Sequence, residues 1–205
     1  VKGTNPNYSK TATTTATLTI NKADLTITVI AQSHTYDGTA KGEDNKTYTT
    51  GIDAKVTAAT LQGGDVLSSI TLNGTKIEKG EYENEIVASA AAVTYGHETD
   101  KTAITDNYNV TYVAGKLTIT ATDEEFTISL DGSTYTYDGT GKAITNTPTS
   151  TAATGTTSYV YSFEEDGEYV ADLSSLTKID AGTYTVYVKG TNPNYSKTAT
   201  TTATL

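Results

Sequence analysis

The sequence predicts an all-β protein made of two antiparallel β-sandwich modules in tandem, preceded by the closing strands of a further module. Three observations support this prediction: internal repeats, alternation of apolar and polar residues, and a composition rich in β-forming residues. Thr occupies about 46 of the 205 positions and Tyr occupies 15, and both residue types favour pleated strands over helices.

Internal repeats define the modules. Residues 1–18 and 188–205 have the same sequence, VKGTNPNYSKTATTTATL, which indicates a duplicated unit of about 187 residues. Inside this unit lies a more diverged repeat, because TYDGT occurs at Thr35–Thr39 and again at Thr136–Thr140. We therefore expect three parts: the closing strands of a preceding module, a first module, and a second module truncated at its last strand, which are residues 1–21, 22–120 and 121–205.

Period-2 alternation marks the expected strands, which is typical of antiparallel sheets with one buried and one solvated face. Asp-Gly and Asn-Gly pairs, which begin at Asp37, Asn73, Asp138 and Asp166, predict turns between strands. The segment Asp65–Ile70 is the only helical turn that we expect. The positions expected to point inward include Leu25, Ile27, Phe126, Ile128, Val186 and Val188.

Charge and composition exclude several classes of protein. The formal net charge is −10, so the surface repels nucleic acid and anionic membranes. The absence of Cys excludes disulfides and thiolate metal sites. No apolar run approaches the ~18 residues of a membrane helix, so we expect no membrane insertion by this segment. His34 and His97 stand in no catalytic motif, and no enzyme is predicted.

A D-x-G-x-Y pattern is formed by Asp180, Gly182 and Tyr184, and Gly80 and Tyr82 belong to a weaker copy. The pattern resembles the tyrosine corner of immunoglobulin-like domains, in which the Tyr hydroxyl bonds back to the backbone near a chain corner. The resemblance implies two immunoglobulin-like sandwiches in which these residues are structural.

The motif Tyr-Asp-Gly near the start of each module predicts a buried aromatic residue followed by a turn whose Gly accepts positive φ. The alternative is that its Asp binds a metal or a sugar. The motif residues are Tyr36, Asp37, Gly38, Tyr137, Asp138 and Gly139.

The motifs TYDGTAK and TYDGTGK, the Gly-x-Tyr strands, and the closing segments NYNVTYVAGKLTI and NYSKTATTTATLTI together resemble the bacterial repeat modules called MBG or YDG domains. The resemblance covers nearly the whole chain. It implies an extracellular position on the bacterial cell surface, in a long surface protein or adhesin. Neighbouring repeats of the same protein are then the expected partners, with homotypic fibre contacts.

An acidic cluster at the expected module junction, Asp123, Glu124 and Glu125, is a weak candidate for a calcium site, because carboxylates at a junction could stiffen an array by sharing one ion. The alternative is a solvated acidic turn, since no EF-hand-type loop is present. We expect no other cofactor.

Two functions follow as hypotheses. The first is a non-enzymatic stalk, spacer or fibre subunit, because linkers of about four or five residues restrict hinge angles. The second is an adhesive module that binds a host glycan, mucin or protein through exposed Tyr side chains.

Two expectations concern order. The polar insertion Tyr95–Asp106 should be the least ordered part of the first module. Residues 1–18 should need a neighbouring copy or a preceding unit, because a lone hairpin is marginally stable in water.

Overall fold

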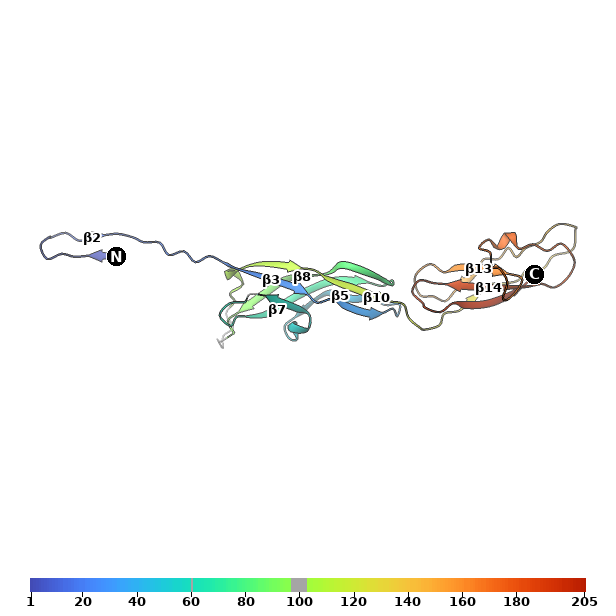
Figure 1. Ribbon diagram of the computed structural model, residues 1–205, viewed down its shortest axis with the longest axis horizontal. Helices are drawn as coiled ribbons and strands as arrows, with labels where there is room; N and C mark the ends of the chain where they lie inside the picture. Colours follow the sequence, from blue (N-terminus) through green and yellow to red (C-terminus); the bar gives the residue numbers. More distant parts are fainter. Residues whose placement is uncertain (60, 97–102) are drawn as a thin grey trace.

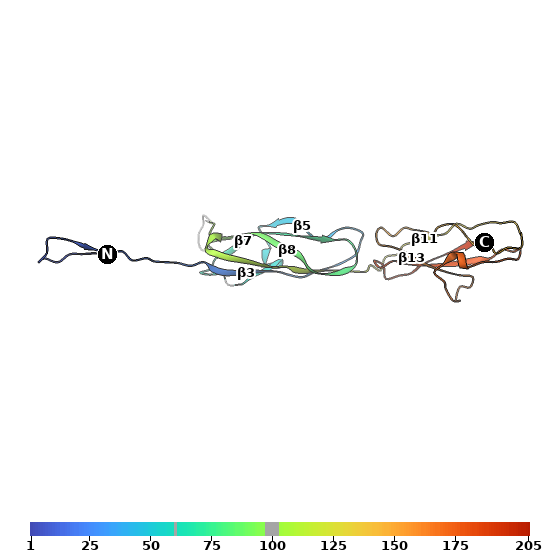
Figure 2. The ribbon, with the colours of Figure 1, turned by 90° about the horizontal axis from the view of Figure 1, so that it is seen from above.

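The computed structural model describes residues 1–59, 61–96 and 103–205. Figures 1 and 2 show an elongated chain in which a leading segment and two β-rich modules follow one another along the long axis. The buried apolar side chains form two clusters, one within residues 25–119 and one within residues 126–203. None of the helices in the described part of the chain is long and apolar enough to cross a membrane.

The first module contains two sheets. The larger has the strand order β4-β10-β8-β7-β5 and the smaller the order β6-β3-β9. The pairs β10–β4 and β3–β9 are parallel, and the other pairs are antiparallel. The strands are β3 (Ala23–Val29), β4 (Gln32–Thr35), β5 (Lys41–Tyr48), β6 (Val56–Ala59), β7 (Val66–Lys76), β8 (Gly80–Thr94), β9 (Tyr108–Val113) and β10 (Gly115–Thr120).

The second module has shorter strands in two antiparallel sheets, with the orders β11-β12 and β13-β14-β15. Its strands are β11 (Ile128–Ser129), β12 (Thr149–Ser150), β13 (Ser158–Ser162), β14 (Thr185–Thr191) and β15 (Ala199–Thr204). The described helical segments are three 3-10 turns, Ile52–Ala54, Thr105–Asn107 and Leu173–Ser175.

The leading segment extends away from the first module on the side opposite the second module (Figure 1). It forms a small hairpin from β1 (Lys2–Gly3) and β2 (Ala12–Thr13), and every residue from 1 to 20 is exposed. Its apolar side chains therefore pack against neither module.

The positions expected to point inward are buried, with exposed fractions between 0% and 7%. This confirms the strand register deduced from period-2 alternation, because a shift by one residue would turn all of them toward solvent. The residues are Leu25, Ile27, Phe126, Ile128, Val186 and Val188.

Two local predictions are wrong. The expected helical turn at Asp65–Ile70 lies mostly in β7, because β7 pairs with both β5 and β8 and buries Ile70 completely. The expected turn at Asn73-Gly74 is also inside β7. Gly74 has a φ of 143°, and a Cβ there would lie 2.0 Å from the carbonyl oxygen of Glu85. The Gly thus permits a close strand approach rather than a turn.

The insertion Tyr95–Asp106, which is expected to be the least ordered part of the first module, includes residues 97–102, and these lie outside the described residues. The described flank contains a bridge between Thr94 and Ala103 and a buried Ile104.

Both Tyr hydroxyls of the D-x-G-x-Y type patterns donate to a backbone carbonyl four residues earlier. The Tyr82 hydroxyl lies 2.9 Å from the Glu78 carbonyl oxygen, and the Tyr184 hydroxyl lies 3.0 Å from that of Asp180. Each ring is partly buried and folds over the Gly two residues before it. A Cβ at Gly80 would lie 2.8 Å from the Tyr82 ring, so any larger residue there would displace the ring.

The substitution Gly80→Ala is expected to destabilise the first module by about 1–2 kcal/mol, because the displaced ring loses its hydrogen bond. Urea unfolding measures the change. Gly3→Ala is the control, since a Cβ at Gly3 meets nothing within 4 Å. Equal stability of the two variants would contradict a structural role for this corner.

Candidate functional site: the joint between the modules

The linker between the modules is held by backbone hydrogen bonds on both sides. The Tyr36 amide donates to the Thr120 carbonyl oxygen at 2.9 Å. The Thr122 amide donates to the Asn194 carbonyl oxygen at 2.9 Å, and the Ser196 amide donates to the Thr122 carbonyl oxygen at 2.9 Å. The linker therefore continues the hydrogen bonding of both modules and is not a loose tether.

A row of aromatic rings crosses the joint. The Tyr36 and Tyr195 rings meet edge to face with centroids 5.6 Å apart, and the Tyr195 ring lies 4.7 Å from that of Phe126. Tyr195 packs against the buried clusters of both modules. Tyr36 is only 2% exposed, and its hydroxyl shares a 2.8 Å hydrogen bond with that of Thr154. The apolar interiors of the modules are thus connected through Tyr195.

A fully buried amide lies beside this row. Asn194 is 0% exposed. Its Oδ1 accepts from the Lys79 backbone amide at 2.7 Å, and its Nδ2 donates to the Glu78 carboxylate. Both ends of the side chain are therefore bonded to the first module, as a buried polar group requires.

Asn192 supports this amide from within the second module. Its Oδ1 accepts from the Asn194 backbone amide at 3.0 Å, and its Nδ2 donates to the Thr154 carbonyl oxygen at 3.1 Å. An Asn side chain that accepts from the backbone two residues later forms a local turn. Asn192 and Asn194 form this turn by themselves, and the turn orients the Asn194 side chain toward the first module.

The Asp residues of the Tyr-Asp-Gly motifs are engaged by their own turns. Asp138 Oδ1 accepts from the Thr140 amide at 2.9 Å and hydroxyl at 2.6 Å, and Asp138 Oδ2 pairs with Lys142 at 2.6 Å. Asp37 makes the same set of contacts with residues two and four positions later. The Lys142 hydrogen bond is the main cause that lowers the pKa of Asp138 to about 2.

The motif prediction holds only in part. Gly38 and Gly139 adopt positive φ of 81° and 77°, as expected. Tyr36 is buried, but Tyr137 is 64% exposed, so the prediction of a buried aromatic residue is wrong there. The cause is tertiary: the base of the second module covers Tyr36, whereas Tyr137 lies at the far tip of the second module.

The acidic residues expected at the junction contact second-module partners. The Ser196 hydroxyl donates to Asp123, and Lys197 pairs with Glu125 at 3.1 Å. The Glu124 amide donates to the Thr122 hydroxyl at 3.2 Å. Within residues 1–59, 61–96 and 103–205, no group of three or more His, Asp or Glu side chains could hold a metal.

Sequence reasoning missed the polar half of the joint. Asn194 and Tyr195 drew notice only as the start of the closing segment NYSKTATTTATLTI, and Glu78 only as the first position of the weaker tyrosine-corner copy, while Thr154 had no signal of its own. The usable signal was the segment GTNPNY, which recurs unchanged in the duplicated ends.

A second buried polar cluster lies inside the first module. Glu43 is 4% exposed, and its carboxylate accepts from the Tyr48 hydroxyl at 2.6 Å, Gln32 Nε2 at 2.8 Å and Lys55 Nζ at 2.9 Å. Burial by itself raises the pKa of Glu43, but these three hydrogen bonds outweigh it and hold the pKa below its usual value.

This cluster predicts acid sensitivity. Because the folded pKa of Glu43 lies below the ordinary 4.5, its stabilisation is full above that pH and is lost as the pH falls through the folded pKa. We expect Glu43→Gln to flatten the fall in stability below pH 5 and to cost about 1–3 kcal/mol at neutral pH. Urea unfolding over a pH series measures both effects.

The control for this prediction is Glu81→Gln. Glu81 is 71% exposed and pairs with Lys116 at the surface, where solvent screens the pair, so its substitution should leave the stability nearly unchanged. A pH profile that Glu43→Gln leaves unchanged would be inconsistent with the role of this cluster.

Comparison of the sequence with known protein families and with curated proteins finds no match.

Proposed function

We propose that the chain is a non-enzymatic structural repeat segment of a long extracellular bacterial surface protein, in which it acts as a stiff spacer or stalk. The observation that carries this proposal is the joint, where Asn194 and Tyr36 are 0% and 2% exposed. Bending the joint would break hydrogen bonds to buried groups, and each group left unsatisfied costs about 1–3 kcal/mol. The two modules therefore behave as one straight unit.

The repeats support the same proposal. Asn5, Asn7 and Tyr8 occupy the places in the leading segment that Asn192, Asn194 and Tyr195 occupy in the second module. A tandem array would thus carry one such joint in every unit. Because each repeat contacts only its neighbours, the stability of the array is nearly a sum of modules and joints, which suits a long rod.

We also propose an immunoglobulin-like fold for both modules. Two Tyr-to-backbone bonds at equivalent positions favour immunoglobulin-like sandwiches of the MBG or YDG type for both modules. The acidic surface, with a net charge of −10, suits a solvated stalk whose partners are neighbouring repeats.

Distance measurements between spin labels test the stiffness of the joint. The chain contains no Cys, so Asp44→Cys and Glu165→Cys, both at exposed positions, place one label in each module. We expect a single narrow distance distribution, which Asn194→Ala broadens. Asn7→Ala is the matched control and should leave the distribution narrow. A broad distribution in the chain with its native Asn194 would refute the spacer.

The adhesive function is the second candidate, and one observation favours it. Tyr135 and Tyr137, 44% and 64% exposed, line a groove at the tip of the second module, and amphipathic rings of this kind stack on sugars. A glycan array and a mucin pull-down test it. Binding that Tyr137→Ala abolishes would support adhesion, and absence of binding would leave the spacer.

A further inference from the structure

The joint between the modules has two halves. The tip of the first module contributes the Tyr36 ring, the Glu78 carboxylate and the Lys79 backbone amide, and the base of the second module contributes the Asn194 side chain. Because the two modules are repeats of one another, the second module also has a tip and the first module also has a base. Each can be compared, position by position, with its counterpart in the joint.

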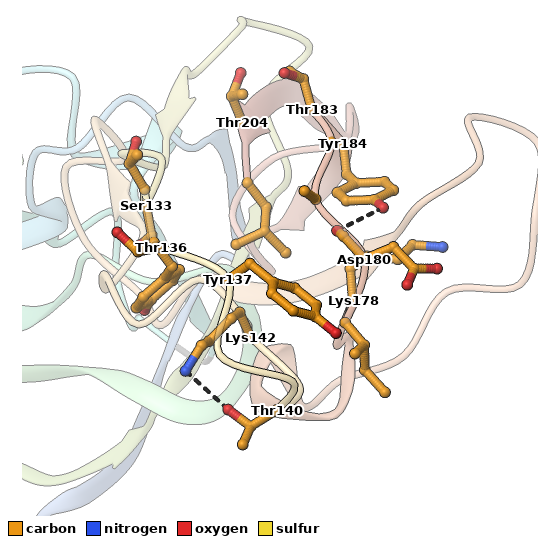
Figure 3. Close-up of a pocket in the computed structure, with 16 residues that line it drawn as sticks. Ser133, Thr136, Tyr137, Thr140, Lys142, Lys178, Asp180, Thr183, Tyr184 and Thr204 are labelled. Carbon is orange, nitrogen blue, oxygen red and sulfur yellow. Dashed lines mark hydrogen bonds between the residues drawn. The ribbon is translucent and has the colours of Figure 1, made fainter.

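The tip of the second module has the groups that the joint uses. The corner motifs place Asp180 where Glu78 stands in the first module, and Ala181 where Lys79 stands. Asp180 carries the same carboxylate on a side chain that is shorter by one methylene. The backbone has the same shape at both places, because the corner Tyr hydroxyl donates to the carbonyl oxygen of Asp180 as it does to that of Glu78. Figure 3 shows Asp180 at this tip together with Tyr137, and Asp180 and Ala181 are exposed.

The base of the first module has the same turn as the base of the second. The Tyr108 amide donates to the Thr105 carbonyl oxygen, and the Tyr195 amide donates to the Asn192 carbonyl oxygen at 3.1 Å. The residue before this Tyr is Asn in both modules. Asn107 is exposed, whereas its counterpart in the second module is fully buried in the joint. The first module therefore presents the same amide side chain at its base.

The linkers that enter the two modules have the same length. Two residues stand between Ile119 and Thr122, and two stand between Ile20 and Ala23. Thr122 and Ala23 each pair in parallel with the Tyr that ends the turn. The residues before Thr19 repeat the closing sequence of the second module, so this linker joins such a sequence to a first module. The spacing that brings tip and base together in the observed joint is thus repeated.

We propose that the base of the first module docks on the tip of the second module of the preceding unit, within one polypeptide, as a second joint of the same construction. Asn107 Oδ1 accepts from the Ala181 amide, and Asn107 Nδ2 donates to the Asp180 carboxylate. Tyr137 is covered by the docked base, as Tyr36 is covered in the first joint. The inference rests on the proposed function and names the contacts that hold one unit to the next.

The two joints differ in their aromatic contacts. Tyr195 packs against the buried clusters of both modules. Tyr108 is 4% exposed within the first module, and its hydroxyl donates to Asp65 at 2.6 Å. Because the Tyr108 ring stays in its own module, the second joint lacks a ring shared by the two interiors. The second joint therefore depends more strongly on Asn107 than the first depends on Asn194.

Distance measurements in a chain of two units test the second joint. This chain consists of residues 1–205 followed directly by residues 19–205, which keeps the repeat in register. Glu165→Cys in the first unit and Asp44→Cys in the second place one spin label on each side of the second joint. We expect a single narrow distance distribution, because a buried amide bonded at both ends fixes the base on the tip.

The same substitution in the other unit is the matched control. Asn107→Ala in the second unit should broaden the distribution at least as much as Asn194→Ala broadens the one across the first joint. Asn107→Ala in the first unit should leave it narrow, because that copy does not lie at the labelled joint. In both units Asn107→Ala should leave the folding of the module intact, since the side chain is exposed in the single chain. A narrow distribution that the second-unit variant leaves unchanged would overturn the proposal.

Failure of this inference is distinguishable from failure of the spacer. Asp44→Cys and Glu165→Cys within one unit report on the first joint alone. A narrow distribution across the first joint with a broad one across the second would overturn the inference and leave each unit stiff. Broad distributions across both joints would refute the spacer as well.

Discussion

Replacing Tyr195 by Ala is expected to destabilise the second module by about 2–4 kcal/mol and to uncouple it from the first. The ring touches the buried clusters of both modules and the rings of Tyr36 and Phe126. Its loss opens a cavity at the joint and exposes the Asn194 network to water. Urea unfolding measures the stability, and the spin-label distances measure the coupling.

The chain supplies a matched control, because Tyr8 has the same neighbours in sequence but is 75% exposed. Tyr8→Ala is expected to change stability by less than about 0.5 kcal/mol. A loss of similar size in the two variants would show that the local sequence, rather than the joint, accounts for the contribution of Tyr195.

The substitution Ile119→Ala is expected to destabilise the first module by about 2–5 kcal/mol. Ile119 is 1% exposed and lies one residue before the end of β10, the strand between β4 and β8, so its truncation leaves a cavity at the tip that receives the second module. Ile20→Ala is the control, since Ile20 stands in the same Leu-Thr-Ile context at 86% exposure. In dilute solution Ile20→Ala should be nearly neutral, and a comparable loss there would contradict the assignment of the tip.

Variants at Tyr195 and Ile119, each with its control at Tyr8 or Ile20, distinguish the contribution of the joint from that of a single module. A variant at Tyr195 acts on both neighbours, whereas a variant at Ile119 acts first on one tip. In a rod, a joint stabilised by buried contacts transmits the orientation of each unit to the next. In the proposed spacer, the length of the array would depend on the number of repeats and its stiffness on residues such as Asn194.

Much of the fold could be predicted because its signals are local. Alternation fixed which side chains face inward, and Asp-Gly turns with positive φ lie where expected in the Tyr-Asp-Gly motifs. The errors occurred where a local signal competed with sheet pairing, as at Gly74, where strand approach replaced the expected turn.

The joint could be predicted only in outline. The repeat lengths placed a short linker near Thr120, but no spacing rule pairs Tyr36 with Tyr195, which is 159 positions later in the sequence. Contacts between modules form between the surfaces of two folded modules, and short sequence motifs do not determine which residues those surfaces bring together. Charge made Asp123 and Glu125 the candidates at the junction, whereas the uncharged Asn194 makes the buried hydrogen bonds to the first module.

The duplicated ends show the division between sequence and tertiary structure. In both copies the hairpin has the same register, since Lys2 pairs with Thr13 as Lys189 pairs with Thr200. The Asn turn is also the same, because the Asn7 amide bonds to Asn5 Oδ1 at 3.0 Å, as in the later copy.

The copies differ in the burial of their Asn and Tyr side chains. Tyr8 is 75% exposed in the leading segment, whereas the same Tyr at position 195 is packed between two modules, and Asn194 is fully buried. Eighteen identical residues determine the local hydrogen bonds, because those bonds form within the segment itself. Only the tertiary structure decides burial, because burial needs surfaces brought from far along the chain, and in this protein those surfaces make the joint.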